Sequence, residues 1–160
     1  MSPHAERMRG MYPGGRADPV ARRLSATWAA VFRCGLAPRR WVTLEVTGRR
    51  SGRLTRFPLG MADVSGHWYL VPMLGADCNW VQNVRAAGGT AVVRRRRVIS
   101  RQLIEVPIAE RPPVIRRYLE KVPGGRPHIP VGRHASSAEL AAIAPQYPVF
   151  RLVPLGSEGP

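Results

Sequence analysis

Apolar residues recur along this chain with two different periods, one typical of helices and one typical of strands. From Leu24 to Leu36 they return every three or four residues, which predicts an amphipathic helix that ends before Pro38. The same spacing predicts further helices at Asn79–Ala87, Pro112–Lys121 and Ala138–Ile143. These segments are short, so each is expected to pack one face against a core that other elements complete.

Strand signals fill most of the remaining chain. Apolar and β-branched residues bounded by Gly and Pro predict strands at Trp41–Val46, Arg56–Val64, Trp68–Met73, Thr90–Val98, Ser100–Pro107 and Pro148–Val153. Asp63–Gly66 is predicted to be a hairpin turn. Because the strands follow one another as hairpins and no G-x-G-x-x-G follows a strand, a parallel dinucleotide-binding fold is disfavoured. The sequence predicts an α+β fold, a small antiparallel barrel or strongly twisted sheet with flanking helices.

The chain is predicted to have one domain. Gly, Pro and Arg dominate residues 1–22 without an apolar period, which predicts a flexible N-terminal arm, and residues 23–160 are expected to fold around one core. The first predicted helix is too short to span a bilayer, and covering the core is favoured over membrane contact as its role. Two cysteines and the lack of an apolar leader make a reducing cytoplasm the expected setting.

The chain is strongly basic. Its formal net charge is +15 at pH 7, which suits a partner that carries phosphate or carboxylate groups. Lys121 is the only lysine among the 25 basic residues, a bias that reflects GC-rich coding better than selection for DNA. No zinc finger, basic zipper or aromatic-rich RNA motif accompanies the charge. An acidic small ligand is therefore favoured over nucleic acid.

The segment Gly48–Leu59 is the first candidate site. It combines four arginines, a serine hydroxyl and two glycines directly after a predicted strand. Guanidinium groups bind phosphate or carboxylate through paired hydrogen bonds, and glycines let backbone N–H groups approach an anion. The segment is therefore predicted to grip an anionic ligand tail. A solvated arginine-rich turn stays open as the alternative.

The segment Pro72–Gly75, which leads into a predicted helix, is the second candidate site. Here a strand ends, Gly75 permits an unusual backbone angle, and the unpaired N–H groups of the helix start face any ligand nearby. Asn79 is expected to cap this helix, and Trp80 is expected to form a wall of the site. Ordinary core packing by Trp80 is the alternative.

Other polar groups give weaker signals. Arg94–Arg97 lies on a predicted strand, so two of its side chains should point to each face, toward solvent or a ligand groove. The four histidines have no acidic companions at metal-ligand spacing, so no metal site is predicted. The chain has no nucleophile motif of a hydrolase and no phosphate loop of a nucleotide triphosphatase.

Five short segments, taken in order, resemble the deazaflavin-dependent nitroreductase and quinone reductase family of actinobacteria. They are Thr47–Gly52, Pro58–Leu59, Gly75–Ala76, Asn79–Trp80 and Asn83–Ala86. The resemblance implies a split β-barrel of the flavin-binding kind. It also implies the deazaflavin coenzyme F-420 as hydride donor, with flavin mononucleotide (FMN) as the weaker alternative. That coenzyme carries a phosphodiester and a glutamate tail, which agrees with the anion grip predicted from the arginine turn.

The resemblance also implies which residues contact the coenzyme. They are Arg49, Arg50, Ser51 and Gly52 in the turn; Thr55, Arg56, Phe57, Pro58 and Leu59 after it; Pro72, Met73, Leu74 and Gly75 in the loop; and Asn79, Trp80, Val81 and Asn83 at the helix start. No catalytic side chain is implied. Trp80, Tyr118 and Tyr147 are candidates to shape the pocket of the acceptor.

The implied activity is hydride transfer from the reduced coenzyme to a quinone, a nitro compound or an activated alkene. A non-catalytic carrier of a flavin, haem or lipid in the same pocket stays open as the alternative, ahead of a basic nucleic-acid-binding module. Exposed strand edges in small barrels favour a homodimer.

The chain departs from the family pattern at two positions. Thr55 stands where the family often has arginine, and Leu74 stands where it often has lysine before the loop glycine. Arg56 is expected to take over the contact of the missing arginine, or else the grip on the coenzyme tail is weaker.

Overall fold

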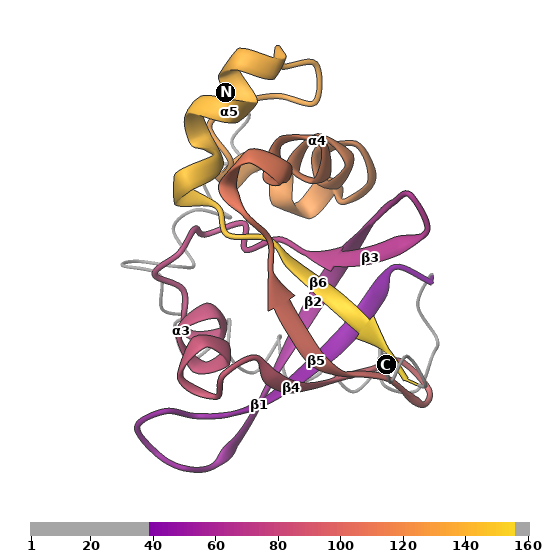
Figure 1. The fold of residues 1–160 in the computed structure, drawn as a ribbon, viewed down its shortest axis with the longest axis vertical. Helices are drawn as coiled ribbons and strands as arrows, with labels where there is room; N and C mark the ends of the chain where they lie inside the picture. The colour runs from indigo at the N-terminus through magenta and orange to yellow at the C-terminus, as the bar shows by residue number, and fades with distance from the viewer. Residues whose placement is uncertain (1–38, 156–160) are drawn as a thin grey trace.

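Six antiparallel strands form a closed barrel in the computed structural model, which describes residues 39–155 (Figure 1). In barrel order they are β1 (Trp41–Thr47), β2 (Leu54–Val64), β3 (His67–Leu70), β6 (Phe150–Pro154), β5 (Val98–Glu105) and β4 (Thr90–Arg94). The barrel closes because β1 pairs with β4 as well as with β2. The predicted small antiparallel barrel with flanking helices is confirmed. The predicted N-terminal arm and first helix lie outside the described residues.

Strands β3 and β4 end well before the predicted residues. β3 ends at Leu70 instead of Met73, because Pro72 has no N–H to offer a neighbouring strand. β4 ends at Arg94, and the N–H of Arg95 donates to the carbonyl of Arg97 over 3.1 Å. The prediction that Arg94–Arg97 sends two side chains to each face of a strand is therefore wrong. Only Arg94 belongs to the sheet, and the next three arginines form a tight turn.

One apolar cluster fills the barrel. Alternate residues of β1 point into it and are at most 2% exposed, namely Val42, Leu44 and Val46. Helix α3 (Asn79–Ala86) closes one end of the barrel. It buries three side chains in the same cluster, namely Trp80, Val81 and Val84.

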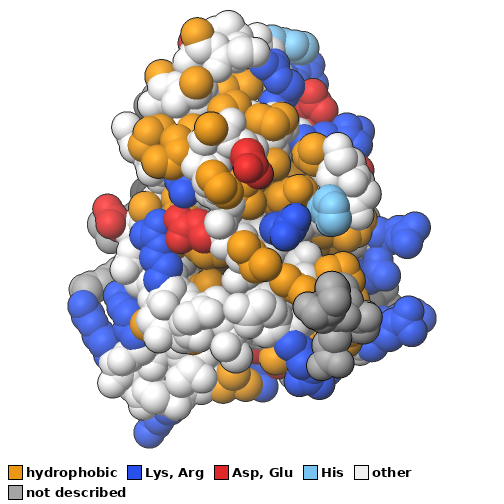
Figure 2. Space-filling model, viewed as in Figure 1, with side chains coloured by type: hydrophobic (Ala, Val, Ile, Leu, Met, Phe, Trp, Pro, Cys, Tyr) orange, Lys and Arg blue, Asp and Glu red, His pale blue; other side chains and the backbone are white. Residues whose placement is uncertain are grey.

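A second apolar cluster lies between the barrel and two helices, α4 (Arg111–Lys121) and α5 (Ser137–Ile143). The side chains that α4 buries there include those predicted to face inward, namely Ile115, Tyr118 and Leu119. The short helix η3 (Pro123–His128) follows α4. Both α-helices stand above the barrel in Figure 1, and Figure 2 shows hydrophobic side chains gathered over this region.

Helices α4 and α5 begin in different ways. Helix α4 has prolines in its first turn, where a missing N–H costs no helical hydrogen bond. Helix α5 has a capping box, in which Ser136 accepts from the N–H of Glu139 while the Glu139 carboxylate accepts from the N–H of Ser136.

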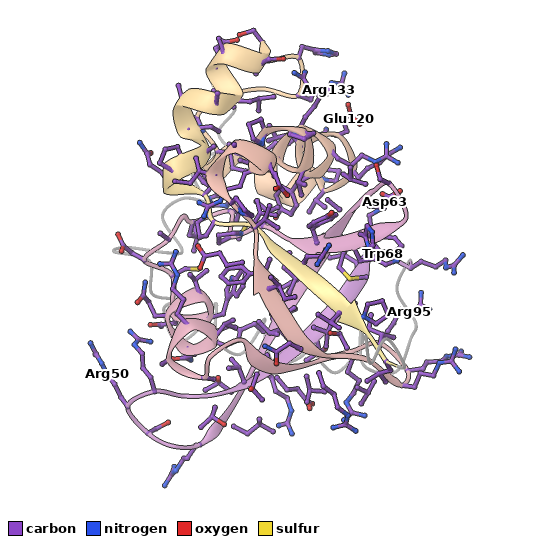
Figure 3. All side chains as sticks on the ribbon, in the orientation of Figure 1. Arg50, Asp63, Trp68, Arg95, Glu120 and Arg133 are labelled. Carbon is purple, nitrogen blue, oxygen red and sulfur yellow. The ribbon has the colours of Figure 1, made fainter. Side chains whose placement is uncertain are left out.

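The two ends of the barrel differ. The helix end carries α3 and the β1–β2 turn, Gly48–Arg53. The opposite end, here called the basic end, carries Arg39, the turn Arg95–Arg97, Trp68 and Leu155. Figure 3 shows Arg50 and Arg95 on opposite sides of the barrel. A ligand held at the β1–β2 turn is therefore remote from the basic end.

Arg111 ties the end of β5 to both helices. It is 6% exposed, and it donates to the carbonyl of Val106 over 2.9 Å, to the carbonyl of Ala144 over 3.1 Å and to the Glu105 carboxylate over 3.1 Å. The pKa of Glu105 is lowered, chiefly by a hydrogen bond from Arg85. Glu105 therefore remains ionised between two arginines, and this cluster fixes where α4 begins.

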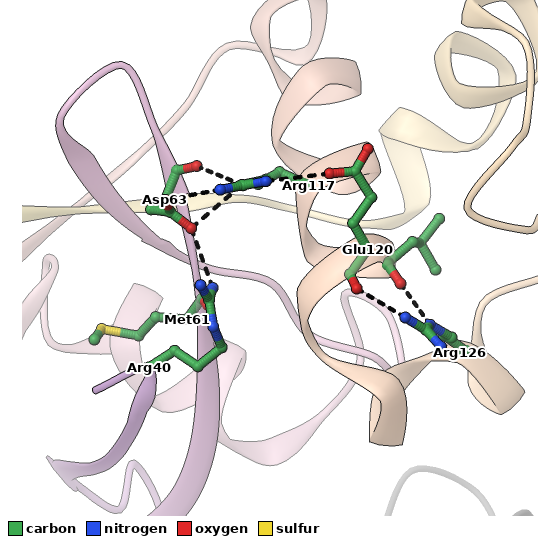
Figure 4. Close-up of polar contacts among 7 residues, drawn as sticks. Arg40, Met61, Asp63, Arg117, Glu120 and Arg126 are labelled. Carbon is green, nitrogen blue, oxygen red and sulfur yellow. Dashed lines mark hydrogen bonds and ion pairs between the residues drawn. The ribbon is translucent and has the colours of Figure 1, made fainter. Parts of the chain in front are cut away.

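Asp63 also joins α4 to the barrel through ion pairs, at a different place from Arg111. Its carboxylate accepts from Arg117 over 3.0 Å and from Arg40 over 3.1 Å, and Arg117 also contacts Glu120 (Figure 4). The hydrogen bond from Arg117 is the main cause of the lowered pKa of Asp63. The ion pairs join α4 to the end of β2 and to the segment before β1.

Replacing Arg111 tests the first of these clusters. Arg111→Met should lower the free energy of unfolding by about 2–4 kcal/mol, because two buried carbonyl oxygens lose their donor and Glu105 loses a partner. Urea unfolding measures this loss. Arg101→Met, at an exposed position of β5, is the matched control and should change the value by less than about 0.5 kcal/mol. Equal losses in both variants would contradict the role of Arg111.

Asp63 should make stability depend on pH. Its folded pKa lies below the ordinary value of 3.8, so the stabilisation is present at neutral pH and is lost as the pH falls through the folded pKa. Asp63→Asn should therefore be less stable than the wild type at about pH 7, with the difference shrinking toward about pH 2. Thermal unfolding across this range measures it, and a difference that grows on acidification would rule out the assignment.

Candidate functional site

The β1–β2 turn is held in shape by its own backbone. The N–H of Gly48 donates to the carbonyl of Arg53, and the N–H of Gly52 donates to the carbonyl of Gly48, both over 2.8 Å. Gly52 has φ +66, a left-handed angle that favours glycine. The Ser51 hydroxyl accepts from the N–H of Arg53 over 3.2 Å. Backbone hydrogen bonds thus close the turn into a compact loop.

Asn83 joins this turn to helix α3, which follows the second candidate segment. Its side-chain oxygen accepts from the N–H of Arg49 over 3.2 Å and from the Arg49 guanidinium over 2.9 Å. Asn83 is only 4% exposed. The structure therefore brings together two segments that are far apart in the sequence, and the buried amide fixes the turn beside the helix.

The groups that remain free on the turn suit an anion. Arg50 and Arg53 are exposed and form no ion pair within residues 39–155, and the N–H groups of Arg50 and Ser51 have no protein partner there. Adjacent free N–H groups beside guanidinium groups form a site for phosphate or carboxylate oxygens. Of the four arginines in the predicted anion site, Arg50 and Arg53 are therefore the two whose guanidinium groups have no partner within residues 39–155.

The run Thr55–Leu59 is divided between the two faces of β2. Thr55, Phe57 and Leu59 lie opposite inward-pointing residues of β1, so they share the face of the barrel interior. Arg56 and Pro58 point to the other face. The predicted contact run therefore cannot touch one small ligand with all five side chains, because successive strand residues alternate.

Arg56 already has a partner on the outer face. Its Nε donates to Glu45 over 3.2 Å, and Arg94 approaches the other oxygen of Glu45 at 3.7 Å. The Glu45 side chain is 8% exposed. On the inner face the Thr55 hydroxyl donates to the carbonyl of Val46 over 2.6 Å. Thr55 and Arg56 thus have different surroundings and cannot substitute for each other without rebuilding the strand.

The loop Pro72–Gly75 lies between the two apolar clusters. Met73 packs against the cluster under α4 and α5, and Leu74 packs against the barrel interior, as do Phe57 and Leu59. Gly75 has φ +83, and a Cβ there would lie 3.3 Å from the carbonyl of Gln146. The loop therefore contributes apolar side chains between the two clusters, and its backbone conformation requires glycine at position 75.

The helix start differs from the prediction in one respect. Cys78 and not Asn79 is the N-cap of α3, and no side chain caps the helix. Burial raises the pKa of the Cys78 thiol to about 11, so it is a neutral packing group. Trp80 is 5% exposed, and its ring centroid lies 5.4 Å from that of Phe150. Trp80 supports the site from within the core.

Comparison with known proteins decides the family. A family model described as F420H(2)-dependent quinone reductase matches residues 21–126, more than half of the chain. The chain belongs to this family. Membership confirms the resemblance found in the sequence, and with it an oxidoreductase that uses the deazaflavin coenzyme. No curated protein matches the chain.

Solved structures share the fold of this family member at low identity. A chain described as a domain-swapped dimer is 20% identical with a TM-score of 0.52, over 85% of this chain and 100% of that one. A heme binding protein from Mycobacterium smegmatis is 12% identical with a TM-score of 0.50, over 83% and 55%. The F420-H2 Dependent Reductase (FDR-A) is 22% identical with a TM-score of 0.49, over 72% and 95%. The first two of these likenesses concern the fold alone.

Two contacts of the candidate segments were not foreseen from the sequence. Glu45 sits between Arg56 and Arg94, and the carbonyl of Gln146 accepts from the N–H of Ala76 over 3.0 Å. A lone carboxylate in an otherwise apolar strand is the signal that could have found Glu45. No sequence signal exists for Gln146, because its contact uses the backbone and spans distant segments.

A separate cavity of about 390 Å³ lies on the other side of α3, against β5. None of the predicted contact residues lines it, and its rim includes the ion pair of Arg85 with Glu105. Within residues 39–155 no group of three or more His, Cys, Asp or Glu side chains could hold a metal ion. No helix in this part of the chain is long and apolar enough to cross a membrane.

Asn83 offers a test of the geometry that does not need the coenzyme. Asn83→Ala should free the turn, because Arg49 loses the acceptor of two hydrogen bonds, at a cost of about 1–3 kcal/mol. Amide hydrogen exchange should then rise at Gly48–Arg53. Asn79→Ala, on the same helix but without such a contact, should leave exchange in the turn unchanged. Unchanged protection in both variants would contradict the link between turn and helix.

Proposed function

We propose that this protein transfers hydride from the reduced deazaflavin coenzyme to an electron-poor acceptor, a quinone in the first place. Nitro compounds and activated alkenes are included as chemically similar acceptors. The single observation that carries the proposal is the link from Arg49 to Asn83, because it joins the β1–β2 turn to helix α3, which carries other candidate residues.

The turn would hold the negative tail of the coenzyme. Arg50 and Arg53 would contact its phosphate or carboxylate oxygens, together with the free N–H groups of Arg50 and Ser51. Arg49 is partly engaged with Asn83 and acts mainly to position the turn. The turn is exposed, so the charged tail stays partly hydrated and no buried charge has to be compensated.

The apolar side of the site would hold the ring system. Phe57, Leu59 and Leu74 are half-buried and pack on the same interior cluster, so they offer a low-polarity surface near the turn. When bound, the reduced deazaflavin supplies the hydride and needs no side-chain nucleophile. The chain's own task is to orient the ring and to exclude water from one of its faces.

Arg56 is left out of the tail grip in this proposal. Its side chain lies on the outer face of β2 and is paired with Glu45, whereas the turn and Phe57 belong to the helix end and the inner face. Without an arginine at Thr55 the grip depends on the turn alone. Affinity for the tail should therefore rest on Arg50 and Arg53.

Titration of the protein with the coenzyme, followed by ring fluorescence, tests this division. Changing Arg50 and Arg53 together to Ala should weaken binding at least about tenfold, since each charge-assisted contact contributes roughly 1.5–3 kcal/mol. Arg56→Ala should weaken it less than about threefold, and Arg101→Ala is the matched control for a lost exposed arginine.

Several outcomes would count against the proposal. If Arg56→Ala weakens binding as much as the double variant, the tail lies on the outer face of β2. If the coenzyme does not bind at all, the proposed function fails. If it binds but no quinone or nitro compound oxidises its reduced form, the protein is a carrier that uses the same pocket.

A further inference from the structure

Strand β5 extends beyond the start of β4, and this leaves the last part of its edge without a neighbouring strand. The first residue of β4, Thr90, pairs with Gln102, whereas β5 continues to Glu105. Before Thr90 the chain turns away from α3 through Gly88 and Gly89, both at left-handed angles, φ +59 and φ +83. The cavity of about 390 Å³ described above lies in this space, between α3 and the end of β5.

The hydrogen bonds of β5 direct one backbone donor toward this cavity. The N–H of Val106 donates to the carbonyl of Val149 over 2.8 Å on the β6 side, and the N–H of Leu103 donates to the carbonyl of Gly89 over 2.9 Å on the opposite side. Successive strand residues direct their N–H groups to opposite edges, so the N–H of Glu105 points to the same side as that of Leu103, past the last pair with β4. A donor on a cavity wall needs water or a ligand as its partner.

The remaining walls of the cavity are mainly apolar. The buried side chains of Val84, Leu103 and Phe150 line it. Gly88 adds only backbone to the lining, and no atom lies within 4 Å of the position that a Cβ would take there. The volume falls within the range of roughly 300–1,000 Å³ that is typical of small-molecule sites, which combine apolar walls with a few polar groups.

The charged side chains at the rim are already paired with one another. Arg85 donates to the two carboxylate oxygens of Glu105 over 3.0 and 2.8 Å, and Arg111 donates to the same carboxylate over 3.1 Å. The pKa of Arg85 is raised, first by its hydrogen bond to Glu105 and also by the negative charge of Asp77. An anionic ligand would meet two carboxylates here and a cationic ligand two arginines, so the charges favour an uncharged ligand.

We propose that this cavity binds a compact, uncharged aromatic carbonyl compound, such as an aromatic amide or ketone. The ring would pack on Val84, Leu103 and Phe150, and the carbonyl oxygen would accept from the N–H of Glu105. An extended peptide fits less well, because Gly89 already occupies the edge at Leu103 and leaves too short a stretch of β5 for a paired strand.

The cavity is separate from the proposed coenzyme site. Its lining residues all lie between Val84 and Phe150, and none is among the predicted coenzyme contacts. Figure 1 shows α3 beside β5 at the front of the view, and in Figure 2 described residues form the surface between them. The proposal does not depend on the proposed function, and each can fail without the other.

Titration of the full chain with benzamide, followed by the backbone amide signals in NMR, tests the proposal. Binding should saturate with a Kd of about 1 mM or below. The Glu105 amide signal should shift, and its hydrogen exchange should slow about tenfold at about ten times the Kd, because only the unbound protein then exposes this N–H. Toluene, which has no carbonyl, should bind at least about fivefold more weakly. Benzoate, which carries a charge, should also bind more weakly than benzamide.

Two glycines offer a matched pair of variants. Gly88 and Gly66 both have left-handed angles, φ +59 and φ +80, and open space at the position of a Cβ, and asparagine tolerates such angles. Gly88→Asn adds a side chain at the cavity wall and should weaken benzamide binding at least about fivefold. Gly66→Asn, in the β2–β3 turn, should leave it unchanged.

Four results would overturn the proposal. They are an unmoved Glu105 amide signal in the wild type, tighter binding of benzoate than of benzamide, equal losses in the two glycine variants, and displacement of benzamide by the coenzyme. Benzamide binding by a protein that fails to bind the coenzyme would support the cavity as a site and contradict the proposed function alone.

Discussion

Closure of the barrel, by pairing of β1 with β4 and of β3 with β6, is the constraint on which the rest of the structure depends. A closed sheet has only two faces, so each strand residue must either fill the interior or face outward. The strand register alone therefore places the Phe57 side chain in the interior and the Arg56 side chain on the outer face. It also leaves two barrel ends, and each receives a different set of arginines.

The arginines of this chain have three separate roles, which cannot be distinguished from the amino-acid composition. Arg111 and Arg117 bind helices to the barrel through carbonyl and carboxylate oxygens. Arg56 and Arg94 share the buried Glu45. The turns at the two ends present exposed guanidinium groups that form no ion pair within residues 39–155. The strongly basic balance therefore reflects internal bonding as much as ligand binding.

The candidate site was predictable in its parts but not in its assembly. Glycines, Ser51 and clustered arginines identified the β1–β2 turn because few other combinations suit an anion. The loop before α3 was visible because Pro72 and Gly75 interrupt a strand pattern. The contact between the turn and the helix depends on Asn83. The local sequence pattern does not predict that this polar side chain is buried. The position of Arg56 on the outer face of β2 likewise follows only from the strand register.

The sequence by itself determined the elements, the antiparallel class, the family resemblance and the chemistry of the turn, because these follow from local periodicity and from residue types at fixed spacing. It placed Arg94–Arg97 wrongly on one strand and gave the capping role to Asn79, since element ends depend on hydrogen bonds that compete over a few residues. Only the tertiary structure decided which arginines form ion pairs with carboxylates and which have no such partner. That outcome depends on partners such as Glu45 and Asp63, and strand pairing and helix packing bring those partners close to arginines remote in sequence.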